Sequence, residues 1–297
     1  MTGTLPIEPA ALETAPEPAD TPPRPRRTLG SIITRAVAGF FAILLLVFIL
    51  GPLLWMAIAA FAKRWKYPNM LPQAWTLDWW GRVLGGADLL PALWLSVKFA
   101  VLATLLACVI CLPAAYALGR ANFPGRRVIL LGLFATNAFP KMGLFTSIAT
   151  LFYAMQLMNT QLGVIIVQML GTVVTMTWIP AAAFASVSPS LIEAARDAGA
   201  GKLRVFFQIT MRLAAPGIAV AVILAFLACF DEAQGTYLIG APTYLTMPTK
   251  MYQLVTNYPQ QAAAVFALVL CVPSVLLLLL VRRHVMGGHL AEGFQLK

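Results

Sequence analysis

The chain has 297 residues, of which 60% are hydrophobic and only 11% are charged. A water-soluble protein carries about a quarter charged residues, so this composition excludes a soluble protein and indicates a membrane protein. The 21 lysines and arginines exceed the 11 acidic residues and give a net charge of +10. Such a charge would suit a nucleic-acid-binding protein, so the positions of the basic residues have to decide between the two explanations.

Residues 1–30 differ from the rest of the chain. They contain seven prolines and four acidic residues, a composition that buries too little apolar surface to offset the entropy lost on folding. No short apolar core is followed by a small-residue cleavage site, so this segment is not a secretory signal peptide. We expect a disordered tail over 1–30 and a second short tail over 286–297, both in the cytoplasm.

Six long stretches with few or no charges follow the first tail. A helix needs roughly 20 apolar residues to cross the hydrocarbon core of a bilayer, and strands of a membrane barrel would alternate between apolar and polar residues instead. The stretches are 37–62, 99–119, 128–153, 162–186, 213–230 (continuing to about 238) and 262–281. This pattern predicts an all-α polytopic membrane protein with six transmembrane helices, divided into a first span with its outer loop (31–90) and a five-span core (91–285).

The basic residues follow the predicted topology. Six spans place both termini on the same side, and a cytoplasmic location for both puts 14 basic residues in inner segments and five in outer loops. This bias agrees with the positive-inside rule, although Lys63, Arg64 and Lys66 fall in an outer loop. Topology therefore accounts for the basic excess, and we do not expect a nucleic-acid partner.

The segment 188–212, between the fourth and fifth spans, has the pattern of two helices separated by glycines. Ser190 and Glu193 have the spacing of a capping box, which predicts a helix start. Gly199 and Gly201 predict its end, because glycine readily adopts the left-handed conformation found there. The pattern alone suits equally an amphipathic element that only tethers two spans at the membrane surface.

Five positions of this segment match the loop shared by the membrane subunits of bacterial ATP-binding-cassette importers. They are Glu193, Ala194, Ala195, Gly199 and Ile209. The chain departs from the family pattern at Met211 and Arg212, where the motif has Leu-Pro. The chain thus resembles the permease subunits of binding-protein-dependent importers.

The resemblance implies a function and a set of partners. In that family the loop forms a coupling helix that docks on a dimer of cytoplasmic ATPases, and those ATPases bind ATP and Mg²⁺. A second homologous permease completes the translocation path, and a periplasmic or extracellular binding protein delivers the solute. We therefore expect no cofactor on this chain and a location in the bacterial cytoplasmic (inner) membrane, surrounded by lipid.

Two branches of the family are similar to different parts of the chain. Segments 116–125, 139–140 and 159–163 resemble the carbohydrate-uptake (maltose-type) branch, whereas 240–252 resembles permeases for polyamines and opines. The resemblance implies a sugar, glycoside or polyol as the solute. The alternative is a polyamine, opine or other charged solute carried by the same machinery.

Two short motifs in the sequence resemble a metal site and a phosphate-binding loop, but both are incomplete. Cys108 and Cys111 have Cys-x-x-Cys spacing inside a predicted span, but a zinc site requires a second ligand pair. The glycines before Lys202 lack the first glycine of a phosphate-binding loop, and Leu203 stands where Ser or Thr is needed. We therefore expect a transport protein and not an enzyme.

A few charged and aromatic residues inside the predicted spans are candidates for contact with the solute. Charges in the membrane usually face a cavity or a partner charge. Lys141, beside Pro140, would line the path or pair with an acid. Asp231 and Glu232 would project about 100° apart on a helix, so that only one faces a cavity while the other forms an ion pair. The candidates are Lys141, Asp231, Glu232, Phe145 and Phe230.

Overall fold

The computed structural model describes residues 29–66, 68–257 and 259–286, which are mostly helical. The predicted tails lie almost wholly outside this part of the chain. Helix α1 (Leu29–Ala60) includes the last two residues assigned to the first tail, and α13 (Gln260–Met286) includes the first residue of the second. The chain forms two compact units, residues 1–53 and 54–297, and the boundary lies within α1.

The described part of the first unit is one apolar helix. Its large side chains, from Val37 to Leu50, are exposed, and Ala36–Ala60 is long and apolar enough to cross a membrane. A helix that is apolar on all sides is stable only if lipid or protein surrounds it. This part of α1 therefore agrees with the predicted first span.

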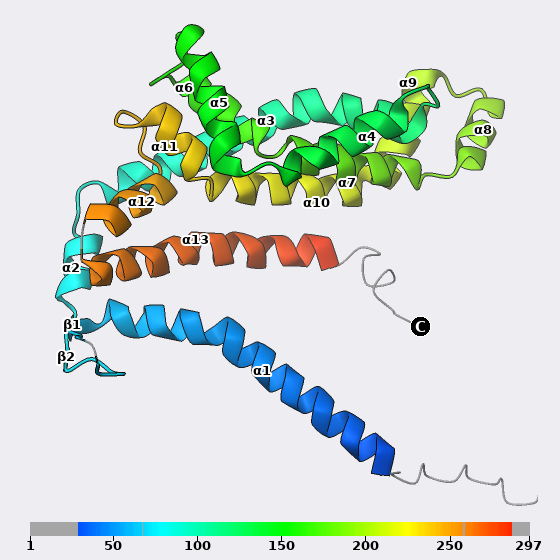
Figure 1. The fold of residues 1–297 in the computed structure, drawn as a ribbon. Coiled ribbons are helices and arrows are strands. Elements are labelled where there is room, and N and C mark those ends of the chain that lie inside the picture. Colours follow the sequence, from blue (N-terminus) through cyan, green and yellow to red (C-terminus); the bar gives the residue numbers. More distant parts are fainter. Residues whose placement is uncertain (1–28, 67, 258, 287–297) are drawn as a thin grey trace, which may run out of the picture. The chain divides into compact units, whose positions relative to one another are not determined.

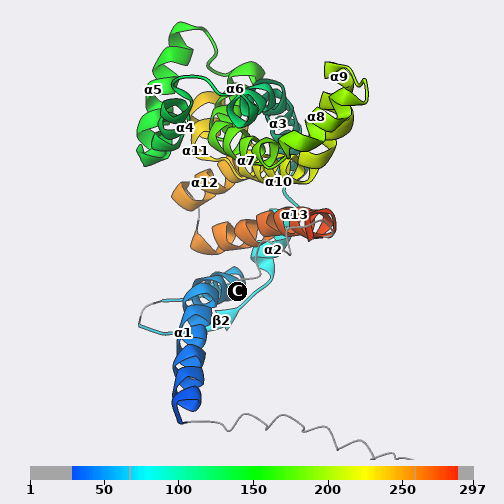
Figure 2. The same ribbon diagram turned by 90° about the vertical axis from the view of Figure 1, so that its right-hand side faces the viewer.

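The second unit is built around three helices that run side by side, α3 (Leu89–Arg120), α7 (Val173–Ala185) and α10 (Met211–Phe230) (Figures 1 and 2). Small buried residues, including Ala103, Ala107, Ala221 and Ala225, line the contacts between them. In a membrane, small residues at the contact allow helices to pack closely through van der Waals contacts. The core thus depends on the backbones coming close together.

Two of the expected spans are bent. Helix α4 (Arg126–Ala135) with the 3₁₀ turn η1 (Thr136–Ala138) meets α5 (Lys141–Ala154) at 104°, and α6 (Gln161–Leu170) meets α7 at 51°. The first bend falls at Pro140, as expected for a residue that cannot donate a backbone hydrogen bond. Hydropathy predicted each pair as one uninterrupted helix, because it averages over a window and does not register a change of direction.

The membrane-spanning capacity of the described helices is close to the prediction. The segments 36–60, 89–120 and 202–230 are each long and apolar enough to cross, and the two bent pairs pass the same test as pairs. Helix α13 contributes a shorter apolar segment, Gln260–Leu276. The predicted continuation of the fifth span to residue 238 is wrong, because α10 ends at Phe230 and a separate helix, α11 (Gln234–Gly240), follows.

The elements that connect these helices gather at the two ends of the bundle (Figure 1). At one end lie the short strands β1 (Ala62–Arg64) and β2 (Ala74–Trp75), helix α2 (Asp78–Leu84) and helix α12 (Met247–Asn257). At the opposite end lie α8 (Pro189–Asp197) and α9 (Lys202–Val205). A π-helical turn, η2 (Phe206–Thr210), joins α9 to α10.

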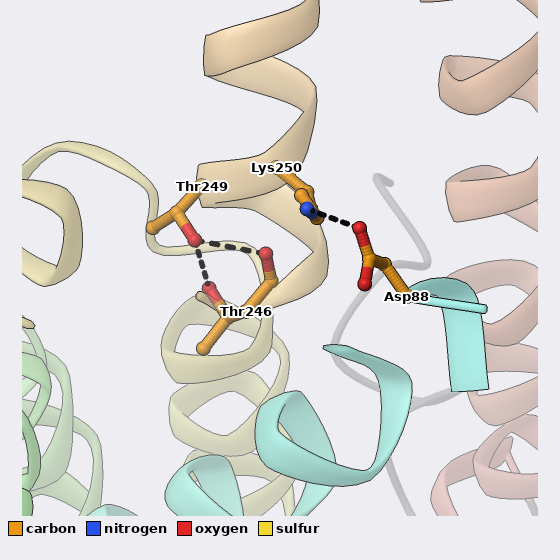
Figure 3. A network of polar contacts seen from close by, with 4 residues as sticks. All are labelled: Asp88, Thr246, Thr249 and Lys250. Atoms are coloured by element: carbon orange, nitrogen blue, oxygen red, sulfur yellow. Dashed lines mark hydrogen bonds and ion pairs between the residues drawn. The ribbon is translucent and has the colours of Figure 1, made fainter. Parts of the chain in front are cut away.

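Polar contacts attach α12 to the beginning of α3 (Figure 3). The Lys250 ammonium lies 2.8 Å from the Asp88 carboxylate, and its hydrogen bond and charge hold the pKa of the Asp88 carboxyl below its ordinary value. Thr249 donates to the Thr246 carbonyl at 2.8 Å, and the Met247 amide donates to Ser96 Oγ at 2.8 Å. The exposed ion pair adds little by itself, so the buried Ser96 contact is the firmer attachment.

A pair of glycines tests whether close packing of α3 against α7 limits stability. A Cβ on Gly119 would lie 2.5 Å from the Ala181 carbonyl oxygen, whereas one on Gly132 in α4 would meet nothing within 4 Å. We expect Gly119→Ala to destabilise the protein by about 1–3 kcal/mol through overpacking. Gly132→Ala should be neutral or slightly stabilising. Thermal unfolding of both variants in detergent checks this, and equal melting temperatures would contradict it.

Candidate functional site

A cavity of about 1010 Å³ opens in the second unit where several helices break. The breaks between η1 and α5, between α6 and α7, and between α10 and α11 all contribute to its lining, together with residues of α13. The lining residues at these breaks are Thr136, Asn137, Phe139, Lys141, Leu170, Gly171, Thr172, Asp231, Glu232, Ala233 and Gln234. Non-helical backbone at membrane depth is tolerated only where protein covers it or a wet cavity adjoins it. The breaks therefore fit a polar path.

Lys141 lies at the first position of α5 and lines this cavity. In the described part of the chain the only ion pair is that of Asp88 and Lys250, so the alternative in which Lys141 pairs with an acid is not found there. A cation at a helix N-terminus opposes the helix dipole. Neither an ion pair nor helix stability therefore explains why a lysine occupies this position.

Asp231 and Glu232 both line the cavity but have different surroundings. The Glu232 carboxylate accepts hydrogen bonds from the backbone amides of Gly235 and Thr236, both at 2.7 Å, and from the Thr236 hydroxyl. It therefore caps the first turn of α11. The prediction that both carboxylates lie on one helix is wrong, because the helix ends before them, and their roles differ for this reason.

Asp231 is the carboxylate that the fold leaves free for the cavity. It is the C-cap residue of α10 and is exposed, and no hydrogen bond or ion pair to its side chain is present among the described residues. A negative charge at a helix C-terminus is unfavourable. Like Lys141, Asp231 is thus placed against the dipole of the helix that carries it.

The two aromatic candidates differ in their relation to the cavity, and a third aromatic residue is more exposed to it. Phe145 lines the cavity but is only 4% exposed, whereas Phe230 is 1% exposed and is not among the lining residues. Phe139 is 64% exposed and lines the cavity. Phe139 precedes Pro140 at the bend and has an extended backbone, as expected for a residue before proline. The Phe-Pro pair was therefore the feature of the sequence that could have indicated a helix break at this position.

Gln168 is a cavity residue that sequence reasoning did not find. Its Nε2 donates to Thr236 Oγ1 at 3.0 Å, which links α6 to the Glu232 cap. Its Oε1 is buried and has no hydrogen-bond partner among the residues that the structure describes, a condition that costs about 1–3 kcal/mol. No periodic or spacing signal marks a lone glutamine in an apolar helix, so only the structure could reveal it.

The predicted coupling segment forms α8, a glycine break and α9, as expected, but it starts differently. The Ser190–Glu193 capping box is not formed. The helix begins at Pro189, which suits the first helical position because its missing N–H would be unpaired there. Ser190 therefore lies inside the first turn, and its hydroxyl is 2.7 Å from that of Ser188.

The end of α8 is a well-formed glycine cap. Gly199 has φ +84°, its amide donates to the Arg196 carbonyl at 2.9 Å, and the Ala200 amide donates to the Ala195 carbonyl at 3.0 Å. These are the two hydrogen bonds of a Schellman motif. A short helix with a fixed end is thus presented at the end of the bundle.

Helix α8 buries one side and leaves the other exposed. Ile192 belongs to a hydrophobic cluster that also contains residues of α3, α7 and α10, whereas Glu193 and Ala194 are exposed and Ala195 is half-buried. No hydrogen bond or ion pair to the Glu193 side chain is present in the described residues. Ile209, the last matching position, is half-buried in η2. The exposed side of α8 is free to contact another molecule.

The sequence of the chain is similar to those of known transport proteins. Residues 111–286, more than half of the chain, match the family described as the binding-protein-dependent transport system inner membrane component. The diacetylchitobiose uptake system permease protein NgcG of Streptomyces coelicolor is 28% identical over 87% of this chain and 88% of its own. The maltodextrin transport system permease protein MdxG of Bacillus subtilis is 28% identical over 85% and 93%.

Solved structures share the fold. A chain of a bacterial ABC transporter involved in the import of the acidic polysaccharide alginate superposes with a TM-score of 0.62 at 18% identity, covering 90% of this chain and 100% of its own. A chain of the MetNI methionine ABC transporter superposes with a TM-score of 0.57 at 18% identity, covering 67% and 95%. At these identities the likeness concerns the fold.

The neighbouring carboxylates offer a matched test of the site. Glu232→Gln should lower the free energy of unfolding by about 0.5–2 kcal/mol, because it weakens a helix cap. Asp231→Asn should leave it unchanged or raise it slightly, because no described group depends on that carboxylate and its charge opposes the dipole of α10. Thermal unfolding of the two isosteric variants measures the difference. Equal losses, or a loss only for Asp231→Asn, would contradict the assignment.

Proposed function

Because the chain belongs to the family of binding-protein-dependent transport system inner membrane components, we propose that it is the permease subunit of an ATP-driven importer for a sugar, glycoside or polyol. The family supports a multi-pass transport protein rather than an enzyme. The relatives named for diacetylchitobiose and maltodextrin support a carbohydrate. The observation that carries the proposal is the cavity at the helix breaks, lined by Lys141 and Asp231, neither of which forms an ion pair within the described part of the chain.

The lining of the cavity fits a neutral, hydroxylated solute better than a polyamine. An amine-binding path would use both carboxylates as counter-charges, but Glu232 is occupied by the α11 cap. The remaining pair, Lys141 and Asp231, offers a donor and an acceptor of opposite charge, which together suit hydroxyl groups. Phe139 supplies an exposed ring against which a sugar can pack. Phe145 also lines the cavity, although it is almost fully buried.

We place six spans in the membrane, formed by α1, α3, the α4–α5 pair, the α6–α7 pair, α10 and α13, with both termini in the cytoplasm. Helix α8 then lies on the cytoplasmic side between the fourth and fifth spans. There it acts as the coupling helix, with Glu193, Ala194 and Ala195 at the contact with the ATPase. The small side chains of the two alanines allow a partner surface to approach closely.

The transport cycle requires partners that supply what this chain lacks. A dimer of cytoplasmic ATPases binds ATP and Mg²⁺, closes, and displaces α8. A second homologous permease forms the other half of the path, and a binding protein outside the membrane delivers the solute. The alginate transporter has been solved in complex with an alginate pentasaccharide-bound periplasmic protein, which supports this kind of partner.

Replacing Lys141 tests the path. Lys141→Met should change the uptake rate or apparent affinity about ten-fold or more, the effect of losing one hydrogen bond to a charged group, without loss of membrane insertion. Lys63→Met, at an exposed position of strand β1 that does not line the cavity, is the control. The measurement is uptake, into vesicles holding the whole transporter, of the solute that the cognate binding protein retains. An unchanged rate and affinity would exclude Lys141 from the path.

Two substitutions, one in α8 and one at the glycine that ends it, test the coupling. Glu193→Lys reverses an exposed charge, and Gly199→Ala strains a left-handed position by about 1–2 kcal/mol. Both variants should insert normally but uncouple ATP hydrolysis from uptake. Gly201→Ala is the matched control, since Gly201 has φ −66° and no atom within 4 Å of an added Cβ. Wild-type uptake by Glu193→Lys and Gly199→Ala would remove α8 from the ATPase contact.

A further inference from the structure

The last turns of α3 contact both ends of the coupling segment. One end is the connection from α7 into α8, around Val187, and the other is the π-helical turn η2, which leads into α10. Tyr116, Gly119 and Arg120 lie within these two turns of α3. Between the two ends, Ile192 is the buried side chain of α8, and the half-buried Ala195 packs against the same hydrophobic cluster. The attachment to α3 therefore limits how α8 can move.

Arg120 holds the first end. Its Nη1 donates to the Val187 carbonyl at 2.6 Å across 67 residues of sequence. Val187 is buried and follows the end of α7, where carbonyl groups lack helical partners. An arginine is favourable there, because it satisfies such a carbonyl and complements the negative end of the helix dipole.

Tyr116 contacts both ends of the coupling segment through its ring. Its ring lies 5.3 Å from the Phe184 ring in α7 and 5.0 Å from the Phe206 ring at the start of η2, edge to face in both cases. Such contacts prefer one mutual orientation of the rings, so they transmit displacement as well as bind. No hydrogen bond to the Tyr116 hydroxyl is present in the described residues, which makes the ring itself the relevant group.

Gly119 lets these contacts form. The backbone of α3 comes so close to α7 here that an added Cβ would lie 2.5 Å from the Ala181 carbonyl oxygen and 3.0 Å from Phe184 Cβ. A helix crossing this tight cannot slide without breaking the neighbouring contacts. The last turn of α3 must therefore either move together with α7 or separate from it.

We propose that Tyr116 and Arg120 are positioning residues that couple the displacement of α8 to α3, and from there to the cavity through α7 and α10, which pack against α3 and contribute lining residues. The proposal rests on the function proposed above, because it assumes that an ATPase moves α8. It adds a site of transmission inside this chain that is distinct from the ATPase contact. Its signature is a protein that still binds its ATPase but no longer changes the cavity when ATP is bound.

A labelling experiment measures that signature without knowledge of the solute. The four cysteines are replaced, and Asn137→Cys in the cavity lining reports access to a polar maleimide. The whole transporter is compared without nucleotide and after trapping with ATP and vanadate. In the parent protein, trapping should change the labelling rate of this cysteine. If it does not, while ATP is hydrolysed, the proposed function fails and not the role of α3.

Paired variants then separate positioning from folding. Tyr116→Leu and Arg120→Ala should reduce the ATP-dependent change in labelling at least about five-fold, with the ATPase still co-purifying and hydrolysing ATP. Tyr116→Phe keeps the ring and Arg120→Lys keeps a donor, so both should retain most of the change. Arg127→Ala, an exposed arginine in the first turn of α4, should behave as the parent.

Two results would overturn the proposal. One is an unchanged ATP-dependent labelling in Tyr116→Leu and Arg120→Ala. The other is a loss of ATPase co-purification or insertion that accounts for the whole effect, because the two residues would then act in folding or docking. Failure of Tyr116→Phe to retain function would also contradict the assignment to the ring.

Discussion

The close approach of α3 to α7 and α10 is the constraint on which the rest of the structure depends. Lipid offers no hydrophobic drive for helices to associate, so contact between backbones and small side chains must supply the attraction. The buried alanines of α3 and α10 and the glycine crossing at Gly119 provide that contact. Once these helices are fixed, the shorter helices at both ends can break and turn without disordering the core. A polar cavity and a protruding α8 are therefore compatible with one stable unit.

Hydropathy predicted where the chain enters the membrane, but the direction of the helices depends on other information. The stretch over 128–153 was predicted as one span. The observed bend of 104° exceeds what one proline imposes, because packing of α5 against α6 and α11 determines where that half of the span goes. In the same way, the fifth span was expected to continue past Phe230 to about residue 238. Nothing in the composition of this stretch revealed that Glu232 would cap a new helix.

The site residues divide in the same manner between what the sequence carries and what it does not. The match at Glu193, Ala194, Ala195, Gly199 and Ile209 located α8, and the glycine cap formed as its chemistry predicts. Asp231 and Glu232 have nearly identical chemistry, so their different roles follow only from the point at which α10 ends. Charged residues inside predicted spans indicated correctly where the cavity lies. Their positions in the sequence do not indicate which of them lacks a partner among the described residues.

The placement of two charges that lack such a partner links the fold to transport. Lys141 begins a helix and Asp231 follows the end of another, so each opposes the dipole of its own helix. The helix dipole does not stabilise a charge in this position. Such a charge therefore gains more free energy from contact with a passing ligand than a charge that already has a partner. A path needs groups that bind a solute without holding it permanently. Breaking the helices at the cavity puts such groups at membrane depth, while the uninterrupted α3 keeps the two ends of the bundle connected.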